Sequence, residues 1–427
     1  MEIIITLTFV LGYIFIAFEH KININKAAIA LLTGVLCWSL YVLFSAEPGH
    51  IAEQLAERTG EISGILFFLM GAMTIVELID AHDGFEVITT TITTSSKRKL
   101  IWIIGFFTFF LSALLDNLTT TIVMVTLLRK LIDDKNDRML FVGMVIIAAN
   151  AGGAWSPIGD VTTTMLWIGG QITTGNIISK LIVPSLVSLA VPLLAFTFMM
   201  KGNTQKSISP DNDDKPTASD VERKVIFFSG VGALLFVPVF KTITHLPPFM
   251  GMLFGLGVLW VLSEIMHRHK GEIEKSKYSV LHALRKIDMP SVLFFLGILV
   301  AVSALQSAGL LSQLAAIMDE KIGNINVVVM SIGLLSAIVD NVPLVAASIG
   351  MYDLQTYPTD HYFWEFLAYC AGTGGSALII GSAAGVAAMG MEKITFFWYF
   401  KKISLFALLG YFAGAVTYLL QHQILGL

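Results

Sequence analysis

Charge is scarce in this sequence: Asp, Glu, Lys and Arg make up 14% of its 427 residues, whereas about a quarter of a soluble domain is charged. This scarcity argues against a soluble protein, and we expect no nucleic-acid partner. Cysteine is rarer still, and because Cys37 and Cys370 both lie in apolar segments we expect no cysteine metal site. Met1 is followed by Glu2 rather than by a basic stretch, which argues against a cleavable signal peptide.

The sequence also lacks the motifs of the enzymes that work in or on membranes. It contains no His-Glu-x-x-His, no Gly-x-Ser-x-Gly and no Walker motif. These absences argue against an intramembrane protease and against coupling to ATP hydrolysis within the chain. We therefore expect a secondary transporter rather than an enzyme, and no cofactor.

Long apolar blocks are what the sequence has in abundance. A helix needs about 20 apolar residues to cross a bilayer, and few soluble proteins carry several such runs. The blocks therefore predict an all-α polytopic membrane protein surrounded by lipid. They cover residues 1–18, 27–45, 63–79, 178–200, 225–240, 248–266, 289–305 and 403–420.

Positive charge is distributed unevenly between the loops. Of the 27 Lys and Arg residues, 23 lie in alternate loops, beginning with the loop that holds Lys21 and Lys26. Such loops face the cytoplasm. The pattern predicts about ten spans with both termini outside. It also predicts two re-entrant hairpins, residues 100–128 from the cytoplasm and 324–351 from outside, because each of these segments has the same kind of flank on both sides.

The two halves of the sequence resemble each other. Leu111–Asn117 and Leu335–Asn341 share the pattern Leu-Ser-Ala-x-x-Asp-Asn, and Asn150–Gly153 matches Gly372–Gly375. Each half has an odd number of predicted spans, so the fold class we expect is two inverted repeats of five spans, each with a re-entrant hairpin and a broken helix. The predicted divisions are repeat 1 (1–205, broken span 139–169), a cytoplasmic linker (206–222) and repeat 2 (223–427, broken span 362–391).

Four stretches, 116–121, 150–164, 340–343 and 372–382, place glycine, proline or polar residues where hydrocarbon is expected. Glycine and proline at this density break a helix, and broken backbone at membrane depth lines a cavity or is buried in protein. Its free carbonyls, with Asp, Asn, Ser and Thr oxygens, suit a hard cation. No stretch contains Lys or Arg. The candidate cation- or proton-binding residues are Asp116, Asn117, Thr119, Thr120, Asn150, Ser156, Asp160, Thr162, Thr163, Asp340, Asn341, Thr373, Ser376 and Ser382, with Na⁺ expected at Asp116, Asn117, Asp160, Asp340 and Asn341.

At Asp160 the two halves of the sequence differ by one carboxylate. It aligns with Ser382, so the first half has one more carboxylate than the second. If the broken span faces the first hairpin tip, Asp160 lies near Asp116, and two carboxylates in a desolvated site cannot both stay ionised without a cation. Separately, Glu77 and His82 end a predicted span and are candidate pH sensors, although a solvated interfacial end explains them as well.

The run Asn150–Trp167, NAGGAWSPIGDVTTTMLW, closely resembles the NhaD family of bacterial sodium/proton antiporters. Glu19-His20, Asn25–Ala28 and Gly71–Glu77 resemble it too, and the resemblance covers almost the whole chain. It implies membership of the broad ion transporter superfamily, with cation sites at hairpin tips and broken helices, a homodimer, elevator-like movement and a place in the bacterial cytoplasmic membrane.

We therefore expect exchange of cytoplasmic Na⁺ (or Li⁺) for external H⁺, with both ions competing for the same carboxylates. The alternative is a Na⁺-coupled organic anion symporter, or an anion exporter, of the same superfamily. Dicarboxylate carriers of that superfamily have Ser-Asn-Thr at their hairpin tips, whereas this sequence has Asp116-Asn117 and Asp340-Asn341. The extra carboxylate at each tip argues against an anionic substrate.

Overall fold

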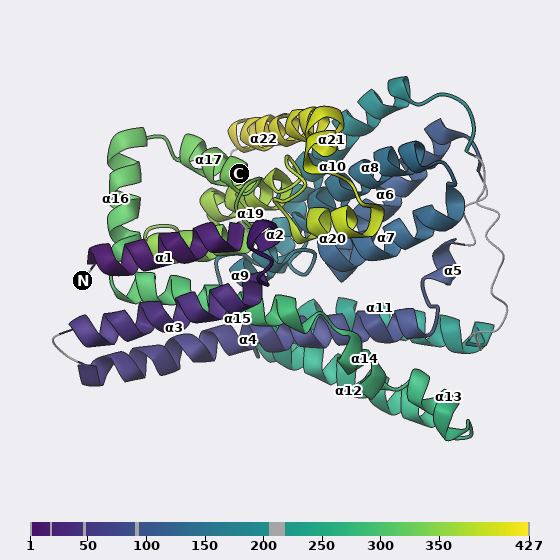
Figure 1. The fold of residues 1–427 in the computed structure, drawn as a ribbon, viewed down its shortest axis with the longest axis horizontal. Coiled ribbons are helices and arrows are strands. Elements are labelled where there is room, and N and C mark those ends of the chain that lie inside the picture. The colour runs from purple at the N-terminus through teal and green to yellow at the C-terminus, as the bar shows by residue number, and fades with distance from the viewer. Residues whose placement is uncertain (1, 18, 46–47, 90–93, 205–217, 426–427) are drawn as a thin grey trace.

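The chain is an all-α, multi-pass membrane protein. A computed structural model describes residues 2–17, 19–45, 48–89, 94–204 and 218–425, which form helices α1 to α22 (Figure 1). Eight of the described helices are long and apolar enough to cross a membrane. They are α3 (Lys26–Phe44), α4 (Pro48–Ala81), α6 (Lys97–Leu115), α10 (Thr174–Met199), α11 (Asp220–Thr244), α12 (Pro248–His267), α15 (Met289–Ser307) and α22 (Ser404–Leu425).

The helices form two layers in Figure 1. The lower layer contains α1 (Glu2–Ala17), α3, α4, α11, α12 and α15, and the remaining long helices lie above it. Within the lower layer α3 and α15 pack closely, because a side chain on Gly34 would strike the carbonyl of Gly297. Trp38 adds a hydrogen bond from Nε1 to the Val300 carbonyl, at 2.9 Å. Small residues at such a crossing let two backbones approach, which is how helices in a membrane gain packing energy.

Two helical hairpins lie in the upper layer. The first is α6 and α7 (Asn117–Leu131), joined at Asp116, and the second is α17 (Ile325–Leu335) and α18 (Asn341–Met351), joined through residues 336–340. Asp116 has a φ of 92°, a conformation that residues other than glycine rarely adopt, and its carboxylate accepts a hydrogen bond from the Thr119 amide at 2.7 Å. The aspartate therefore both turns the chain and caps the returning helix.

Two helices are broken beside the hairpins. α8 (Lys135–Gly153) is followed by a break and α9 (Val161–Ile168), and α19 (Tyr362–Gly374) is followed by a break and α20 (Ala383–Glu392). Asp160 caps α9 through the Thr162 amide at 2.9 Å, and Ser382 caps α20 through the Gly385 amide at 3.2 Å. Both breaks lie inside the predicted broken spans. The inverted relation of the repeats across a bilayer stays a prediction.

The hairpins and the broken helices pack through matching contacts in the two halves. A side chain on Gly152 would strike the Phe109 carbonyl of α6, and one on Gly374 would strike the Gly333 carbonyl of α17. Ser112 donates to the Ala149 carbonyl at 2.6 Å, and in the second half Ser336 donates to the Ala371 carbonyl at 3.1 Å. Each hairpin is thus fixed to its broken helix at backbone distance.

This packing makes Gly374→Ala destabilising. The new methyl group meets backbone on α17, which cannot move as a flexible side chain does, so we expect a cost of about 1–3 kcal/mol and a lower unfolding temperature in detergent. Gly232→Ala, in α11, is the matched control because no atom lies within 4 Å of its added Cβ. Equal unfolding temperatures for the two variants would contradict the close packing of α17 on α19.

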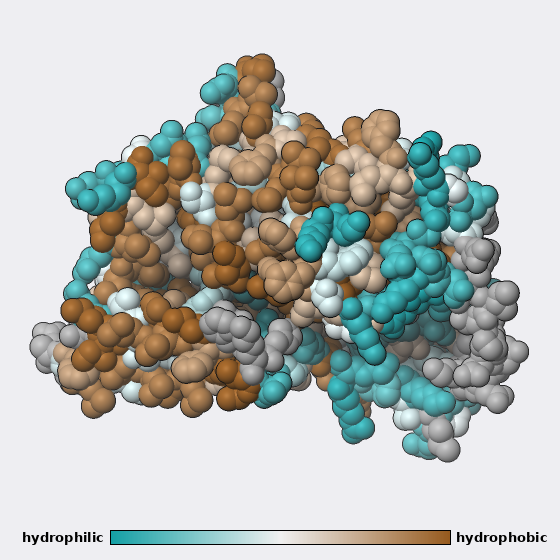
Figure 2. Space-filling model, turned by 45° about the horizontal axis from the view of Figure 1, so that its top comes forward, coloured by the Kyte–Doolittle hydropathy of each residue, from teal (hydrophilic) through white to brown (hydrophobic). Residues whose placement is uncertain are grey.

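The short helices mark the two ends of the molecule. α5 (Glu86–Thr89), α13 (Glu272–Lys277) and α14 (Val280–Lys286) lie to the right in Figure 1, here called the α13 end, whereas α16 (Leu310–Ile322) crosses the long axis at the opposite end, the α16 end. Figure 2 shows polar residues gathered toward the right, with further ones at the upper left edge, and a broad apolar surface between them. The basic segments predicted to be cytoplasmic include α13 and α14, and most of the predicted linker 206–222 lies outside the described residues. The other short helices are α2 (Glu19–Ile22) and α21 (Phe396–Lys402).

Candidate cation site

Asp160 is the centre of the candidate site. It is 2% exposed, and it receives an amide hydrogen bond from each hairpin tip: from Asn117 at 2.5 Å and from Asn341 at 3.4 Å to either oxygen. Thr162 adds its hydroxyl at 2.8 Å. Since Asn117 and Asn341 begin α7 and α18, the two hairpin tips meet at one carboxylate contributed by the broken helix.

Asp116 lies close to this centre. Its two oxygens accept from the Thr119 amide and, at 2.9 Å, from the Thr119 hydroxyl. Asp116 and Asp160 line the same cavity of about 20 Å³, together with apolar residues such as Phe68 and Met252. Within the described part of the chain no basic side chain forms an ion pair with either carboxylate. A buried carboxylate and a half-buried one beside it, neither with a basic partner, favour a proton or a metal cation that neutralises them.

Asn150 joins the two halves of the chain. Its side-chain oxygen accepts from Asn117 at 3.1 Å, and its side-chain nitrogen donates to the Ser382 hydroxyl at 3.0 Å. Asn150 itself is fully buried. A single amide therefore links the first broken helix to the second.

Asp340 has a basic partner that sequence reasoning missed. Lys26, the first residue of α3, places its ammonium nitrogen 3.5 Å from Asp340 Oδ2 and 4.3 Å from the centre of the Phe294 ring. From the sequence, Lys26 is predicted to be a loop charge that fixes the topology, and the polar stretches contain no Lys or Arg. This prediction is incomplete, because in the fold Lys26 lies at a hairpin tip. The signal available was the Asn25–Ala28 run, which resembles the NhaD family.

Most of the remaining predicted hydroxyls donate to backbone carbonyls rather than to carboxylates. Thr163 donates to the Asp160 carbonyl, and Ser156 to the Ala113 carbonyl. Thr373 and Ser376 donate to carbonyls at the end of their own helix, and the hydroxyl of Thr120 is buried without a hydrogen-bond partner. The structure thus gathers Asn117, Asn150, Asp160, Thr162, Asn341 and Ser382 into one hydrogen-bond network. Asp116 and Thr119 form a separate pair beside it, and Ser156, Thr163, Thr373 and Ser376 make helix-breaking or capping contacts.

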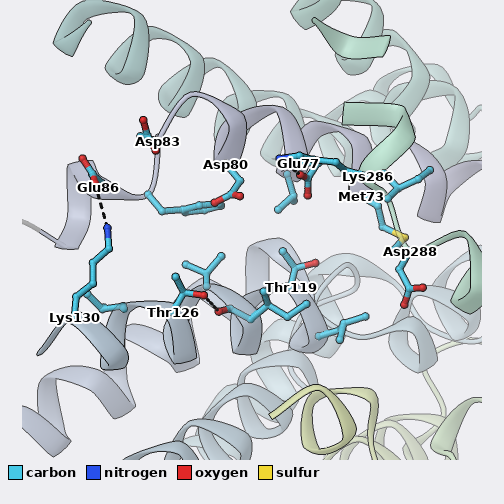
Figure 3. Close-up of a pocket in the computed structure, with 17 residues that line it drawn as sticks. Met73, Glu77, Asp80, Asp83, Glu86, Thr119, Thr126, Lys130, Lys286 and Asp288 are labelled. Carbon is cyan, nitrogen blue, oxygen red and sulfur yellow. Dashed lines mark hydrogen bonds and ion pairs between the residues drawn. The ribbon is translucent and has the colours of Figure 1, made fainter. Parts of the chain in front are cut away.

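An acidic cavity of about 380 Å³ lies beside the site toward the α13 end. In Figure 3, Glu77 and Asp80 of α4 face Thr119 of α7 across it. Glu77 pairs with Lys286 at 3.2 Å. Because Thr119 lines this cavity and also bonds Asp116, one residue connects the cavity with the first hairpin tip.

His82 is buried at the same end of α4. Its Nδ1 lies 2.7 Å from the Leu78 carbonyl, and its ring is 5.1 Å from the His267 ring and 4.9 Å from the Tyr278 ring. Burial lowers the pKa of His82 to about 4. The imidazole is therefore neutral across the physiological range in this conformation, and pH sensing by His82, which stays a prediction, requires a state in which the ring is exposed.

A second cavity of about 560 Å³ opens at the α16 end, lined by Arg58 of α4, Met165 of α9, Gln306 of α15 and Tyr352 after α18. Hairpin tips, broken helices and a buried polar site between cavities at opposite ends define a secondary transporter, not an enzyme.

Comparison with known proteins identifies the family. A family model described as citrate transporter matches residues 13–364. Over 98% of this chain and 99% of its own length, sodium/proton antiporter 2 of Arabidopsis thaliana is 50% identical. Sodium/proton antiporter 1 of the same plant is 51% identical over 99% of this chain and 73% of its own. The Na(+)/H(+) antiporter NhaD of Vibrio cholerae is 30% identical over 98% of this chain and 91% of its own. The chain belongs to the NhaD-type sodium/proton antiporters of the ion transporter superfamily.

Proposed function

We propose that this protein exchanges cytoplasmic Na⁺ (or Li⁺) for external H⁺ by alternating access, with Asp116 and Asp160 as the carboxylates that both ions occupy in turn. The observation that carries the proposal is Asp160 itself. It is a buried carboxylate held by amides from both hairpin tips, and no basic side chain of the described residues pairs with it.

The exchange follows from electrostatics. A bare carboxylate away from water is costly, so Asp160 and Asp116 hold either a proton or a cation while they cross between the two ends of the molecule. Oxygen ligands from Asp116, Asp160, Thr119 and Thr162 suit Na⁺, which is a hard cation. Since proton and Na⁺ neutralise the same charge, the binding of one releases the other, and movement of the occupied site exchanges them.

The arrangement of layers supports alternating access. The hairpins and broken helices form a unit of the upper layer, held together by the backbone contacts at Gly152 and Gly374. That unit moves against α3, α4, α11, α12 and α15, and so opens the site alternately to the acidic cavity and to the cavity at the α16 end. From the charge pattern we infer that the acidic cavity faces the cytoplasm and that both termini lie outside.

Transport of an organic anion is the competing proposal, and the name of the matching family model favours it. An anion such as citrate needs cationic or N–H groups that are free to receive it. Lys26 is the basic side chain at the site, and it is already paired with Asp340. Citrate would also face the charges of Asp116 and Asp160. Cation exchange is therefore the better proposal.

Proteoliposomes provide the test. The purified protein is reconstituted with a pH-sensitive dye inside, and an outward Na⁺ gradient is imposed. We expect the interior to acidify when the gradient is Na⁺ or Li⁺ and not when it is choline, with citrate having no effect on the rate. A pH change that requires citrate would replace cation exchange with anion symport, and no pH change in any condition would remove the proposal.

A further inference from the structure

The ion pair between Lys26 and Asp340 connects the two layers of the molecule. Lys26 begins α3, whose glycine contact with α15 fixes it in the lower layer, whereas Asp340 lies at the tip of the second hairpin in the upper layer. The side chains are 24% and 16% exposed. The pair is therefore partly buried, and separating its two charges leaves each of them without a partner in a partly desolvated place, which is costly.

The surroundings of Asp340 provide room and ligands for a cation other than the lysine. Tyr13, Glu19, Lys26, Asp340 and Ser382 line a cavity of about 70 Å³, which exceeds the space that a water molecule needs. The Tyr13 hydroxyl is buried and has no hydrogen-bond partner, and the Glu19 carboxylate accepts from the Lys26 backbone amide at 3.1 Å. Two carboxylates and an unpartnered hydroxyl thus line the same cavity as the lysine.

Asp340 is also next to the central site. The following residue, Asn341, donates its amide to Asp160. Among the side chains that the structure describes, the charged and titratable groups near Asp340 are Lys26 from α3, Glu19 from α2, Tyr13 from α1 and Asp160 from the break before α9. Lys26 is the one positive charge in this set.

We propose that Lys26 is a tethered cation that displaces the transported ion from Asp340 in the conformation seen here. This inference rests on the proposed exchange and adds a role for the second hairpin. When the upper layer moves, Asp340 leaves Lys26 and must take up Na⁺ or a proton to stay neutral. When it returns, the lysine ammonium takes the place of that ion, which is released into the adjacent cavity. Ion release at Asp340 is thereby coupled to the position of the hairpin.

Replacing Lys26 tests this role, and the quantities to compare are the maximal exchange rate and the apparent KM for Na⁺. In Lys26→Met the ion is no longer displaced, so we expect the apparent KM for Na⁺ and the maximal exchange rate to fall together, each roughly tenfold. Lys26→Arg keeps the charge and retains the wild-type KM. Lys99→Met is the matched control, because Lys99 is exposed at the start of α6. A lower rate with an unchanged KM would mean that Lys26 is only structural, and wild-type values for both would also overturn the proposal.

The double variant Lys26→Met with Asp340→Asn tests whether the ion retained in Lys26→Met is bound to the Asp340 carboxylate. Without the Asp340 carboxylate nothing holds the ion at this tip, so we expect the KM to rise to the wild-type value or above. A KM that stays low would place the ion elsewhere and overturn the proposal. Isothermal titration of detergent-solubilised protein with NaCl separates this inference from the proposed exchange, because tighter Na⁺ binding to Lys26→Met than to wild type is measured without transport. Lys26→Gln replaces the methionine variant if the latter does not fold, with the same outcomes.

Discussion

Asp160→Asn is expected to abolish Na⁺-driven proton movement while leaving a folded protein in the membrane. The asparagine keeps an oxygen that can accept from the Thr162 amide, so the cap of α9 survives. It loses the negative charge on which the cation depends. A unit charge at about 4 Å is worth roughly 4 kcal/mol at an effective dielectric constant near 20, which corresponds to about 1000-fold in Na⁺ affinity.

The amides around Asp160 increase the loss of Na⁺ affinity that we expect. Asn117 and Asn341 both present N–H groups to the carboxylate, so a neutral amide at position 160 leaves donors facing a donor. The measurement is dye-reported pH change in proteoliposomes over a range of Na⁺ concentrations and pH values. Asp133→Asn is the matched control, since Asp133 is exposed in the loop between α7 and α8. Exchange at the wild-type rate with an unchanged pH profile in Asp160→Asn would make Asp160 a structural cap, and the mechanism would have to be abandoned.

The local elements of this fold could be predicted from the sequence because their signals are local. An apolar run that ends in Asp-Asn twice, at residues 116–117 and 340–341, predicts two reversals. α6 ends at Leu115, directly before the first pair, and α17 ends at Leu335, before the turn 336–340. Glycine and proline after Asn150, and glycine around Gly374, predict the breaks for the same reason. Each of these signals acts within a few residues along the chain, so no knowledge of tertiary structure was needed.

The partners across the site could not be predicted in the same way. Asn150 and Ser382 lie on different halves of the chain, and which hydroxyl meets the asparagine amide depends on how the broken helices cross. The pairing of Lys26 with Asp340 could not be predicted either, and the reason is physical as well. A lysine between two apolar runs has the same composition signal whether it faces the cytoplasm or turns inward to a carboxylate, and only the packing of α3 against α15 decides between them.

Asp160 and Ser382 differ in charge although they occupy equivalent positions. The two residues cap equivalent helices, α9 and α20, so both side chains accept a hydrogen bond from a backbone amide. The carboxylate exceeds what a cap requires, because the Ser382 hydroxyl accomplishes capping without charge. The surplus charge in the first half therefore calls for a ligand, and the amides of both hairpins are directed at it.

Asp116→Asn is the second change for which we expect complete loss of exchange, and it tests the first hairpin tip. Asparagine has nearly the same shape as aspartate, so we expect it to keep the turn at φ 92° and ψ 159°, and its side-chain oxygen can still accept from the Thr119 amide. What disappears is the second of two adjacent charges. Asp160 then loses the carboxylate that lines the same small cavity, and Na⁺ binding is expected to weaken by about the same 1000-fold as in Asp160→Asn.

Proton release on Na⁺ binding distinguishes a lost ligand from a damaged turn. Titration of the purified protein with NaCl in two buffers of different ionisation enthalpy measures the protons released per Na⁺ bound. Wild type is expected to release protons from the Asp116 and Asp160 pair, and Asp116→Asn to release fewer at any Na⁺ concentration that still binds. Thr119→Val is the matched variant, because it removes the hydroxyl that donates to Asp116 and keeps the amide that caps α7. It is expected to change the apparent Na⁺ affinity while proton release per bound Na⁺ stays at the wild-type value. Wild-type proton release in Asp116→Asn would show that Asp116 carries no exchanged proton and would leave Asp160 as the sole carboxylate on which Na⁺ and H⁺ compete.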